Sequence, residues 1–276
     1  MANTTSSNAP FADRVAIVTG GTQGLGEAIA TLFAERGAKG LVLCGRNADN
    51  GRKVAQRLTA GGCTAHYVQA DLANVDDCRK VVAAADRQFG RVDALINVAA
   101  LTDRGTILDT SPELFDRMFA VNVRAPFFLM QDAAKIMRRE KIRGAIVNIL
   151  SMSAHGGQPF ITAYCSSKGA LLTLTKNVAF GLMRDGIRVN GLNIGWMDTP
   201  GEDRIMRLYH DAQDGWRERA EAGLPFGRMV KVGEVARAVA YLASEESGLM
   251  TGSIIDFDQS VLGCYEASPQ PSPATS

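Results

Sequence analysis

Short apolar segments alternate along the chain with longer segments that have helical periodicity. The apolar segments cover residues 14–19, 40–45, 65–70, 93–98, 145–150, 187–192 and 253–258. Apolar and polar residues do not alternate cleanly within them, which is typical of strands buried on both faces of a parallel sheet. We therefore expect seven strands in one parallel sheet.

The segments between the strands predict helices. One covers residues 25–36, where apolar side chains recur on one face and Gly37 follows as a stop signal. Similar patterns occur at residues 48–60, 75–89, 112–139, 163–184 and 233–244. This alternation predicts an α/β fold, a doubly wound sheet with right-handed crossovers and helices on both faces.

The alternation continues over residues 11–265, for which we expect a single domain. Residues 1–10 and 266–276 are rich in Ser, Pro, Thr and Ala, and this composition predicts disordered tails. Only residues 195–230 interrupt the pattern, with two tryptophans, two prolines and many charges. Long insertions of this kind often cover a site, so we interpret this segment as a lid.

Composition argues against several classes of function. The chain has 276 residues, 46% of them hydrophobic, and a net charge of +1, which offers no field for holding nucleic acid or an anionic membrane. It has no apolar run of about 18 residues, and its first residues do not resemble a signal peptide. Five scattered cysteines without a CxxC pair and three distant histidines predict a reduced, cytoplasmic protein without a metal site.

A glycine-rich turn joins the first predicted strand to the first predicted helix. Its sequence is Thr19-Gly20-Gly21-Thr22-Gln23-Gly24-Leu25-Gly26. Glycines permit the unusual backbone angles of such a turn and the close approach of a pyrophosphate, and the free amides of a helix N-terminus attract phosphate. An ordinary βα turn would also tolerate glycines, but the strand–turn–helix context favours dinucleotide binding.

Tyr164 and Lys168 lie four residues apart, a spacing that puts both side chains on one face of a helix. A phenol with a pKa of about 10 is a poor base at neutral pH, and a nearby ammonium group would lower that pKa. Tyr164 could then exchange a proton with a substrate hydroxyl. Taken alone, such a pair is usually two surface residues.

The glycine turn has the T-G-x-x-x-G-x-G spacing of the short-chain dehydrogenase/reductase family, which the chain resembles from about residue 12 to residue 262. The resemblance implies a Rossmann-like fold and an NAD(P)-dependent oxidoreductase that moves a hydride between nicotinamide and an alcohol or ketone. It implies four catalytic residues, Asn122, Ser151, Tyr164 and Lys168. Ser151 would hydrogen-bond the substrate oxygen, with Ser153 as its nearest competitor, and Asn122 would support a proton path to Lys168.

The resemblance also implies the cofactor contacts. Asp71 would contact the adenine, Asn97-Val98-Ala99-Ala100 resembles the family's N-N-A-G, and Thr199 would orient the carboxamide from a segment that resembles N-P-G-x-x-x-T. Alanine replaces the last glycine of the first motif, and Ile194 replaces the proline of the second. The expected cofactor-binding residues are Gly20, Thr22, Gln23, Gly24, Leu25, Gly26, Arg46, Asp71, Leu72, Asn97, Ala99, Tyr164, Lys168 and Thr199.

The end of the second predicted strand bears on the choice between NAD and NADP. An acidic residue there would bind the ribose hydroxyls and repel a 2′-phosphate, but this strand ends in Cys44-Gly45-Arg46-Asn47. Arg46 could clamp a 2′-phosphate, so NADP is favoured over NAD. Against this, Gln23 stands where NADP users of the family often have a second basic residue, and Arg46 could instead be solvated or stack on the adenine.

The lid mixes aromatic and hydrogen-bonding side chains, which suits a sugar, sugar acid or polyol. The expected substrate-binding residues are Ser151, Ser153, His155, Gln158, Tyr164 and Trp196. Two alternatives stay open: a reductase of apolar ketones, and a catalytically inactive dinucleotide-binding sensor or scaffold with the same fold. Many of the lid charges could also simply face water.

Two predicted helices, at residues 112–139 and 163–184, carry apolar side chains on more than one side, Phe127 and Leu172 among them. One side must cover the sheet, and the other needs a second partner. The resemblance implies that these helices pair across a two-fold axis, so we expect a homotetramer or a homodimer. The other expected partner is a small-molecule substrate.

Overall fold

The computed structural model describes residues 9–264; the tails expected at 1–10 and 266–276 lie almost entirely outside this range. Seven strands form one sheet in the order β3-β2-β1-β4-β5-β6-β9, and every neighbouring pair is parallel. The strands are β1 (Val15–Thr19), β2 (Gly40–Gly45), β3 (Thr64–Gln69), β4 (Ala94–Asn97), β5 (Ala145–Ile149), β6 (Arg188–Ile194) and β9 (Ile254–Phe257). All seven lie where the apolar segments predicted them, and the doubly wound, Rossmann-like fold is confirmed.

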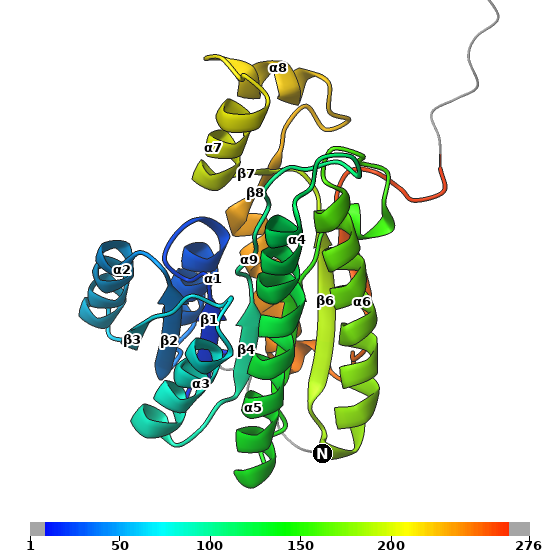
Figure 1. Ribbon diagram of the computed structural model, residues 1–276. Helices are drawn as coiled ribbons and strands as arrows, with labels where there is room; N and C mark the ends of the chain where they lie inside the picture. Colours follow the sequence, from blue (N-terminus) through cyan, green and yellow to red (C-terminus); the bar gives the residue numbers. More distant parts are fainter. Residues whose placement is uncertain (1–8, 265–276) are drawn as a thin grey trace, which may run out of the picture.

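Helices cover both faces of the sheet. The long ones are α1 (Gly24–Glu35), α2 (Ala48–Ala60), α3 (Val75–Phe89), α5 (Ala125–Arg139), α6 (Thr162–Leu182) and α9 (Val232–Ala243). Buried side chains of α1, α2 and α9 form one hydrophobic cluster with the sheet, and those of α3, α5 and α6 form a second cluster on the other face. Figure 1 shows α5 and α6 in front of the sheet and α9 behind it.

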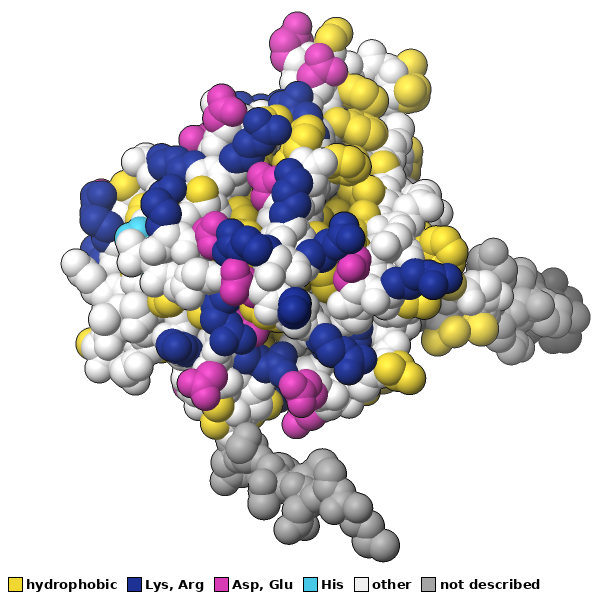
Figure 2. All heavy atoms as spheres, turned by 90° about the horizontal axis from the view of Figure 1, so that it is seen from below, with side chains coloured by type: hydrophobic (Ala, Val, Ile, Leu, Met, Phe, Trp, Pro, Cys, Tyr) yellow, Lys and Arg dark blue, Asp and Glu magenta, His cyan; other side chains and the backbone are white. Residues whose placement is uncertain are grey.

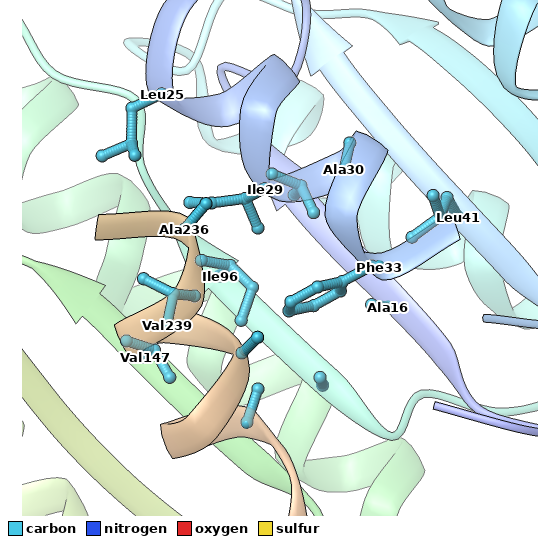
Figure 3. Close-up of a cluster of buried hydrophobic side chains, with 14 of the residues drawn as sticks. Ala16, Leu25, Ile29, Ala30, Phe33, Leu41, Ile96, Val147, Ala236 and Val239 are labelled. Carbon is cyan, nitrogen blue, oxygen red and sulfur yellow. The ribbon is translucent and has the colours of Figure 1, made fainter. Parts of the chain in front are cut away.

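The core of the first face lies between α1 and α9. Figure 3 shows Ile29 and Phe33 of α1 and Val239 of α9 directed towards Ile96 of β4. All four side chains are completely buried. Burial of each such side chain contributes about 1.5–3 kcal/mol. This packing holds α1 rigidly against the strand ends, so the glycine turn at its start has a fixed position.

The helix predicted over residues 112–139 is interrupted. The structure has α4 (Pro112–Phe119), a π-helical turn (Ala120–Arg124) and then α5. The Ala125 amide donates to the Ala120 carbonyl, one residue further back than in an α-helix. Pro126, which follows, has no amide to donate to residue 122. Apolar periodicity continues through this turn, so the sequence pattern alone did not reveal it.

The segment expected to be a lid, residues 195–230, has its own secondary structure. It contains β7 (Met197–Asp198), α7 (Pro200–Tyr209), α8 (Trp216–Ala222) and β8 (Val230–Lys231), and β7 pairs with β8. Figure 1 shows α7 and α8 beyond the carboxyl ends of the sheet strands, apart from the main body. This is the edge at which ligands bind in doubly wound folds.

The opposite end of the molecule has no surface of a single charge. Figure 2, viewed from below, shows Lys and Arg side chains interspersed with Asp and Glu over most of that face. Within residues 9–264, no helix is long and apolar enough to cross a membrane.

Candidate active site

The glycine turn at the start of α1 is shaped by its backbone. Gly20 and Gly24 have φ angles of +64° and +53°, in the left-handed region that favours glycine. A Cβ atom on Gly26 would lie 2.2 Å from the Gly20 carbonyl oxygen, so no larger residue fits there. Gln23 precedes the helix without capping it through its side chain. The first-turn amides of α1 therefore keep no side-chain acceptor and are free for a phosphate.

Thr19, the last residue of β1, ties this turn to the neighbouring strand. Its Oγ1 accepts hydrogen bonds from the amides of Val98 and Ala99 at 2.9 and 3.1 Å, and it lies 3.4 Å from the Ile96 carbonyl as a donor. The bonds hold the ends of β1 and β4 together at the floor of the cleft. Sequence reasoning missed this role, although Thr19 opens the quoted motif.

The end of β2 carries no acidic side chain. Asn47 accepts a hydrogen bond from the Asn50 amide at 3.0 Å and so caps α2. The Arg46 side chain is exposed and forms no ion pair within residues 9–264. Its guanidinium group is thus free to bind an anion at the edge of the cleft.

Asp71, which follows β3 and lines the same cleft, is already paired. Burial disfavours its ionised form, but the Ala73 amide and Arg117, each at 3.0 Å, outweigh that effect and lower the pKa of Asp71. Asp71 therefore stays ionised at neutral pH, with one oxygen of the carboxylate neutralised by Arg117.

Ser151 and Tyr164 meet at the carboxyl end of β5. Ser151 follows the strand directly, and its Oγ accepts a hydrogen bond from the Ser153 amide at 3.2 Å. Burial raises the pKa of Tyr164 to about 12, and hydrogen bonding with Ser151 acts in the opposite direction. The sequence-based expectation of a lowered phenol pKa is therefore wrong for the protein alone, because loss of hydration dominates.

Lys168 lies one turn further along α6 and is almost completely buried. Its Nζ donates to the Ile149 carbonyl at 2.7 Å and lies 5.7 Å from the centre of the Tyr164 ring. Burial lowers the pKa of Lys168 to about 8. Within residues 9–264 the ammonium group thus has one acceptor, and it stays mostly protonated at neutral pH.

Asn122 lies in the π-helical turn rather than in a regular helix. Its Oδ1 accepts from the Leu101 amide at 2.8 Å, and its Nδ2 donates to the Leu101 carbonyl at 2.9 Å and to Ser167 Oγ at 3.0 Å. The side chain thus joins the loop after β4 to α6, beside Lys168. The widened turn lets it reach both partners.

A buried polar network also crosses the sheet behind the site. Asn97 donates to Asn148 Oδ1 at 2.8 Å, and Asn148 donates to Thr175 at 2.9 Å. Oδ1 of Asn97 has no hydrogen-bond partner within residues 9–264. Unpartnered buried oxygens of this kind are typical binding points for an ordered water molecule.

A single cleft of about 1820 Å³ brings most of the expected site residues together. Asn97 and Asn122 do not line it and lie buried behind its wall. The other expected residues do line it: Gly20, Thr22, Gln23, Gly24, Leu25, Gly26, Arg46, Asp71, Leu72, Ala99, Ser151, Ser153, His155, Gln158, Tyr164, Lys168, Trp196 and Thr199. In the part of the chain that the structure describes, no cluster of His, Cys, Asp or Glu could hold a metal ion.

Two further groups of polar side chains shape the wall around Ser151. The Ser153 hydroxyl bonds to Gln158, which lies before α6. His155 contacts Asn193 of β6 at 2.9 Å, and Asn193 in turn donates to Asp256 of β9 at 2.7 Å. The expected substrate-binding residues on this side are therefore fixed by neighbours from three elements.

The lid closes the other side of the cleft. Thr199 caps α7 by accepting from the Glu202 amide at 3.0 Å, and Trp196 Nε1 donates to the Glu202 carboxylate at 2.8 Å. The Tyr209 hydroxyl donates to Asp103 at 2.9 Å, which docks α7 on the loop after β4. The lid is thus attached to the body by polar contacts at the cleft itself.

Arg104 also lines the cleft, but sequence reasoning did not single it out. Its side chain is 16% exposed, and it donates to the Thr102 carbonyl at 3.1 Å and to His210 at 3.2 Å. Nothing in the sequence around it forms a motif; only the fold brings it opposite the lid.

Comparison with known proteins gives consistent matches over nearly the whole chain. A family model described as enoyl-(acyl carrier protein) reductase matches residues 20–260. An uncharacterized oxidoreductase of Thermotoga maritima is 34% identical over 248 residues, which cover 90% of this chain and 97% of that protein. A sorbitol dehydrogenase of Cereibacter sphaeroides is 30% identical over 89% of this chain and 96% of its own length.

Solved structures agree with these matches. A putative NAD(P)-dependent gluconate 5-dehydrogenase from Beutenbergia cavernae, crystallised with bound NADP at low occupancy, superposes with a TM-score of 0.82 and is 28% identical. The match covers 92% of this chain and 98% of that one.

Proposed function

Because the chain belongs to the short-chain dehydrogenase/reductase family, whose members are NAD(P)-dependent oxidoreductases, we propose that it moves a hydride between a nicotinamide ring and the carbinol carbon of a small polyhydroxylated molecule. The substrate is a sugar, a sugar acid or a polyol. One observation carries the proposal: Ser151, Tyr164 and Lys168 converge in one large cleft at the carboxyl end of the sheet.

Each of these side chains has a distinct role in this proposal. Tyr164 takes the hydroxyl proton when the alcohol is oxidised and returns it when the ketone is reduced. Ser151 hydrogen-bonds the substrate oxygen, where negative charge develops. Lys168, which needs more acceptors than the Ile149 carbonyl, holds the nicotinamide ribose and favours the Tyr164 phenolate. Asn122 fixes the backbone beside Lys168 and supports its proton path.

The cleft fits a dinucleotide. The uncapped first turn of α1 and the close approach allowed by Gly26 suit a pyrophosphate. Asp71 and Leu72 would flank the adenine, Ala99 the adjoining ribose, and Thr199 the carboxamide. When bound there, the nicotinamide supplies the hydride acceptor or donor, which no protein side chain can provide.

NADP is the preferred cofactor in this proposal. Arg46 is exposed at the end of β2, where an acidic residue would select NAD, and it has no ion-pair partner among residues 9–264. A planar guanidinium binds a phosphate through two parallel hydrogen bonds. Gln23 and Thr22 of the glycine turn line the same part of the cleft and add neutral donors.

Polar and aromatic groups around the reacting position favour a hydroxylated substrate. Ser153, His155 and Gln158 line the cleft on the side of Ser151, and Trp196 lines it from the lid. The relatives point in the same direction, since one is named for sorbitol and one for gluconate. Such walls bind hydroxyl groups well and reject substrates that leave their polar atoms unpaired.

A steady-state assay tests the proposal. Wild-type protein is incubated with NADP⁺ or NAD⁺ and a panel of sugars, polyols, aldonic acids and simple secondary alcohols, and reduced nicotinamide is followed at a wavelength of about 340 nm. Equilibrium binding of both cofactors is measured in parallel. We expect turnover with at least one polyhydroxylated substrate. Tight cofactor binding without any turnover would instead indicate a dinucleotide-binding protein that is not an enzyme.

A further inference from the structure

Two opposite charges face each other across the substrate end of the cleft. Arg104 lies in the loop after β4, and Glu202 lies in the first turn of α7 on the lid. Nη2 of Arg104 is 3.8 Å from Oε1 of Glu202, and the side chains are only 16% and 21% exposed. That distance is too long for a direct hydrogen bond. The two groups are thus close, partly desolvated and not joined.

Contacts with neighbouring residues, on the side away from Glu202, hold the Arg104 guanidinium in place. Arg104 donates through Nη1 to the Thr102 carbonyl and through Nε to His210, and its guanidinium carbon lies 5.6 Å above the Phe160 ring. These three contacts leave Nη2 without a hydrogen bond within residues 9–264. Side chains fixed in this way lose little entropy when a ligand binds.

Glu202 is held in the same manner. Trp196 Nε1 donates to its Oε1 at 2.8 Å, and its amide donates to the hydroxyl of Thr199. Oε2 makes no hydrogen bond within the described residues. A free donor on Arg104 therefore faces a carboxylate that still has lone pairs to offer.

The Arg104 loop lies beside the start of α6, which carries Tyr164: the Gly105 amide donates to the Phe160 carbonyl at 2.9 Å, and the Thr162 amide donates to the Gly105 carbonyl at 3.1 Å. The pKa of Tyr164 is raised chiefly by burial and is lowered by Ser151; beyond these, the charge of Glu202 raises it and that of Arg104 lowers it. All three residues line the same cleft. A substrate bound at Tyr164 therefore occupies the same cleft as the charged pair.

We propose that Arg104 and Glu202 together bind the hydroxyl group on the carbon next to the one that is oxidised, with Arg104 donating and Glu202 accepting. This inference rests on the proposed function, since it assigns the neighbouring group of that substrate. The enzyme then selects a vicinal diol over an isolated secondary alcohol.

The spacing suits a single bridging oxygen. Two hydrogen bonds of about 2.8 Å that meet at a tetrahedral oxygen span about 4.6 Å. Nη2 of Arg104 and Oε1 of Glu202, now 3.8 Å apart, therefore need to part by less than about 1 Å, a small movement of α7. Oε1 has a second lone pair, so it can accept from the hydroxyl while it keeps the bond from Trp196. A hydroxyl can accept and donate at once, whereas a carboxylate only accepts and would be repelled by Glu202. The neighbouring group is thus a neutral hydroxyl.

The test compares two alcohols that differ by this one group, butane-2,3-diol and butan-2-ol. We expect wild-type kcat/KM to be at least about tenfold higher for the diol, since a hydrogen bond to a charged group is worth that much or more. In Glu202→Gln and Arg104→Met the ratio falls towards one, mainly through loss of activity on the diol. Glu218→Gln, an exposed lid residue outside the cleft, is the matched control and keeps the wild-type ratio.

A binding measurement separates this inference from the proposed function. Trp196 contacts Glu202, so diol binding to the protein with NADP⁺ is followed by tryptophan fluorescence. Turnover of both alcohols with similar kcat/KM overturns the inference and leaves the proposed function intact. Saturable, Glu202-dependent diol binding without turnover of any alcohol overturns the proposed function and keeps the diol site. Neither turnover nor binding overturns both.

Discussion

At Tyr164 and Lys168, burial and charge act in opposite directions. Loss of hydration raises the pKa of the phenol to about 12 and lowers that of the ammonium group to about 8, so burial disfavours both charged forms. The phenol is therefore protonated at neutral pH and ready to donate a proton to a ketone. For alcohol oxidation it must first lose that proton, which Ser151 and the Lys168 charge would assist.

Because Lys168 is buried, we expect the stability difference between Lys168→Met and the wild type to depend on pH. Its pKa is 10.5 in the unfolded chain and about 8 in the folded protein. Between these values the unfolded chain holds a proton that the folded chain lacks, so the stability of the wild type rises with pH. Below about pH 8 the full cost of burying the ammonium is present. Lys168→Met removes that cost.

We expect the free energy of unfolding of Lys168→Met, relative to wild type, to fall by on the order of 2–3 kcal/mol between pH 7 and pH 10. Urea denaturation at both pH values measures it. Lys176→Met, an exposed lysine on the same helix, is the control and should give the same difference at both pH values. An equally flat profile for Lys168→Met would mean that its pKa is not lowered.

Arg46 predicts cofactor selectivity. Arg46→Asp removes a partner of the 2′-phosphate and adds a like charge, so the Kd for NADP(H) should rise much more than the Kd for NAD(H). Fluorescence titration of both cofactors with both proteins measures the two ratios. Unchanged NADP(H) binding would show that another residue selects the cofactor.

At the scale of single elements, the glycine turn leaves no room for a side chain at position 26. A methyl group there would lie 2.2 Å from the Gly20 carbonyl oxygen, a backbone atom that cannot turn aside. Gly26→Ala should therefore shift the glycine turn, weaken cofactor binding at least about tenfold and destabilise the fold by about 1–3 kcal/mol. Gly223→Ala on the lid, where the added methyl would keep an ordinary distance, is the control. Wild-type cofactor affinity in Gly26→Ala would contradict the assigned role of this turn.

Apolar patterning located every strand of the main sheet. The five central strands are buried on both faces and leave long apolar runs, whereas the edge strands β3 and β9 are partly exposed and have shorter ones. The π-helical turn at Asn122 was not predictable in this way, since hydrophobic positions continue through it while only the backbone hydrogen bonds change. The lid was recognised as an insertion, but not its two helices. Their polar contacts, such as Trp216 to Asp203, arise from the folded arrangement.

Within the candidate site, the motif residues and the wall residues next to them in sequence were predictable, whereas Arg104 was not. Ser151, Tyr164 and Lys168 stand at fixed spacings on adjoining elements, and the structure brings them into one cleft. Arg104 and Glu202 come from segments about 100 residues apart and face each other only because the lid folds back over the strand ends. Such pairs depend on tertiary structure that local patterns do not encode.

At the scale of the whole molecule, apolar surface predicts self-association. Leu129, Met130 and Leu171 are buried in the core. Phe127 of α5 is 44% exposed, and Phe180 of α6 is 79% exposed. We expect a homodimer or a homotetramer by light scattering at micromolar concentration. Phe127→Asp should lower the measured mass, while Leu208→Asp on the lid should not. A monomeric wild-type protein would refute the expected assembly.

The proposed chemistry depends on one hydroxyl group, and its removal is the most direct test. Tyr164→Phe keeps the ring that packs in the cleft and deletes the hydroxyl to which we assign the exchange of the substrate proton. With the best substrate of the panel, kcat should fall by about 10²–10⁴, while the Kd for NADP(H) stays within about threefold of wild type. If Tyr164→Phe kept more than about a tenth of the wild-type kcat, Tyr164 would not be the proton donor and the account of this site would be wrong.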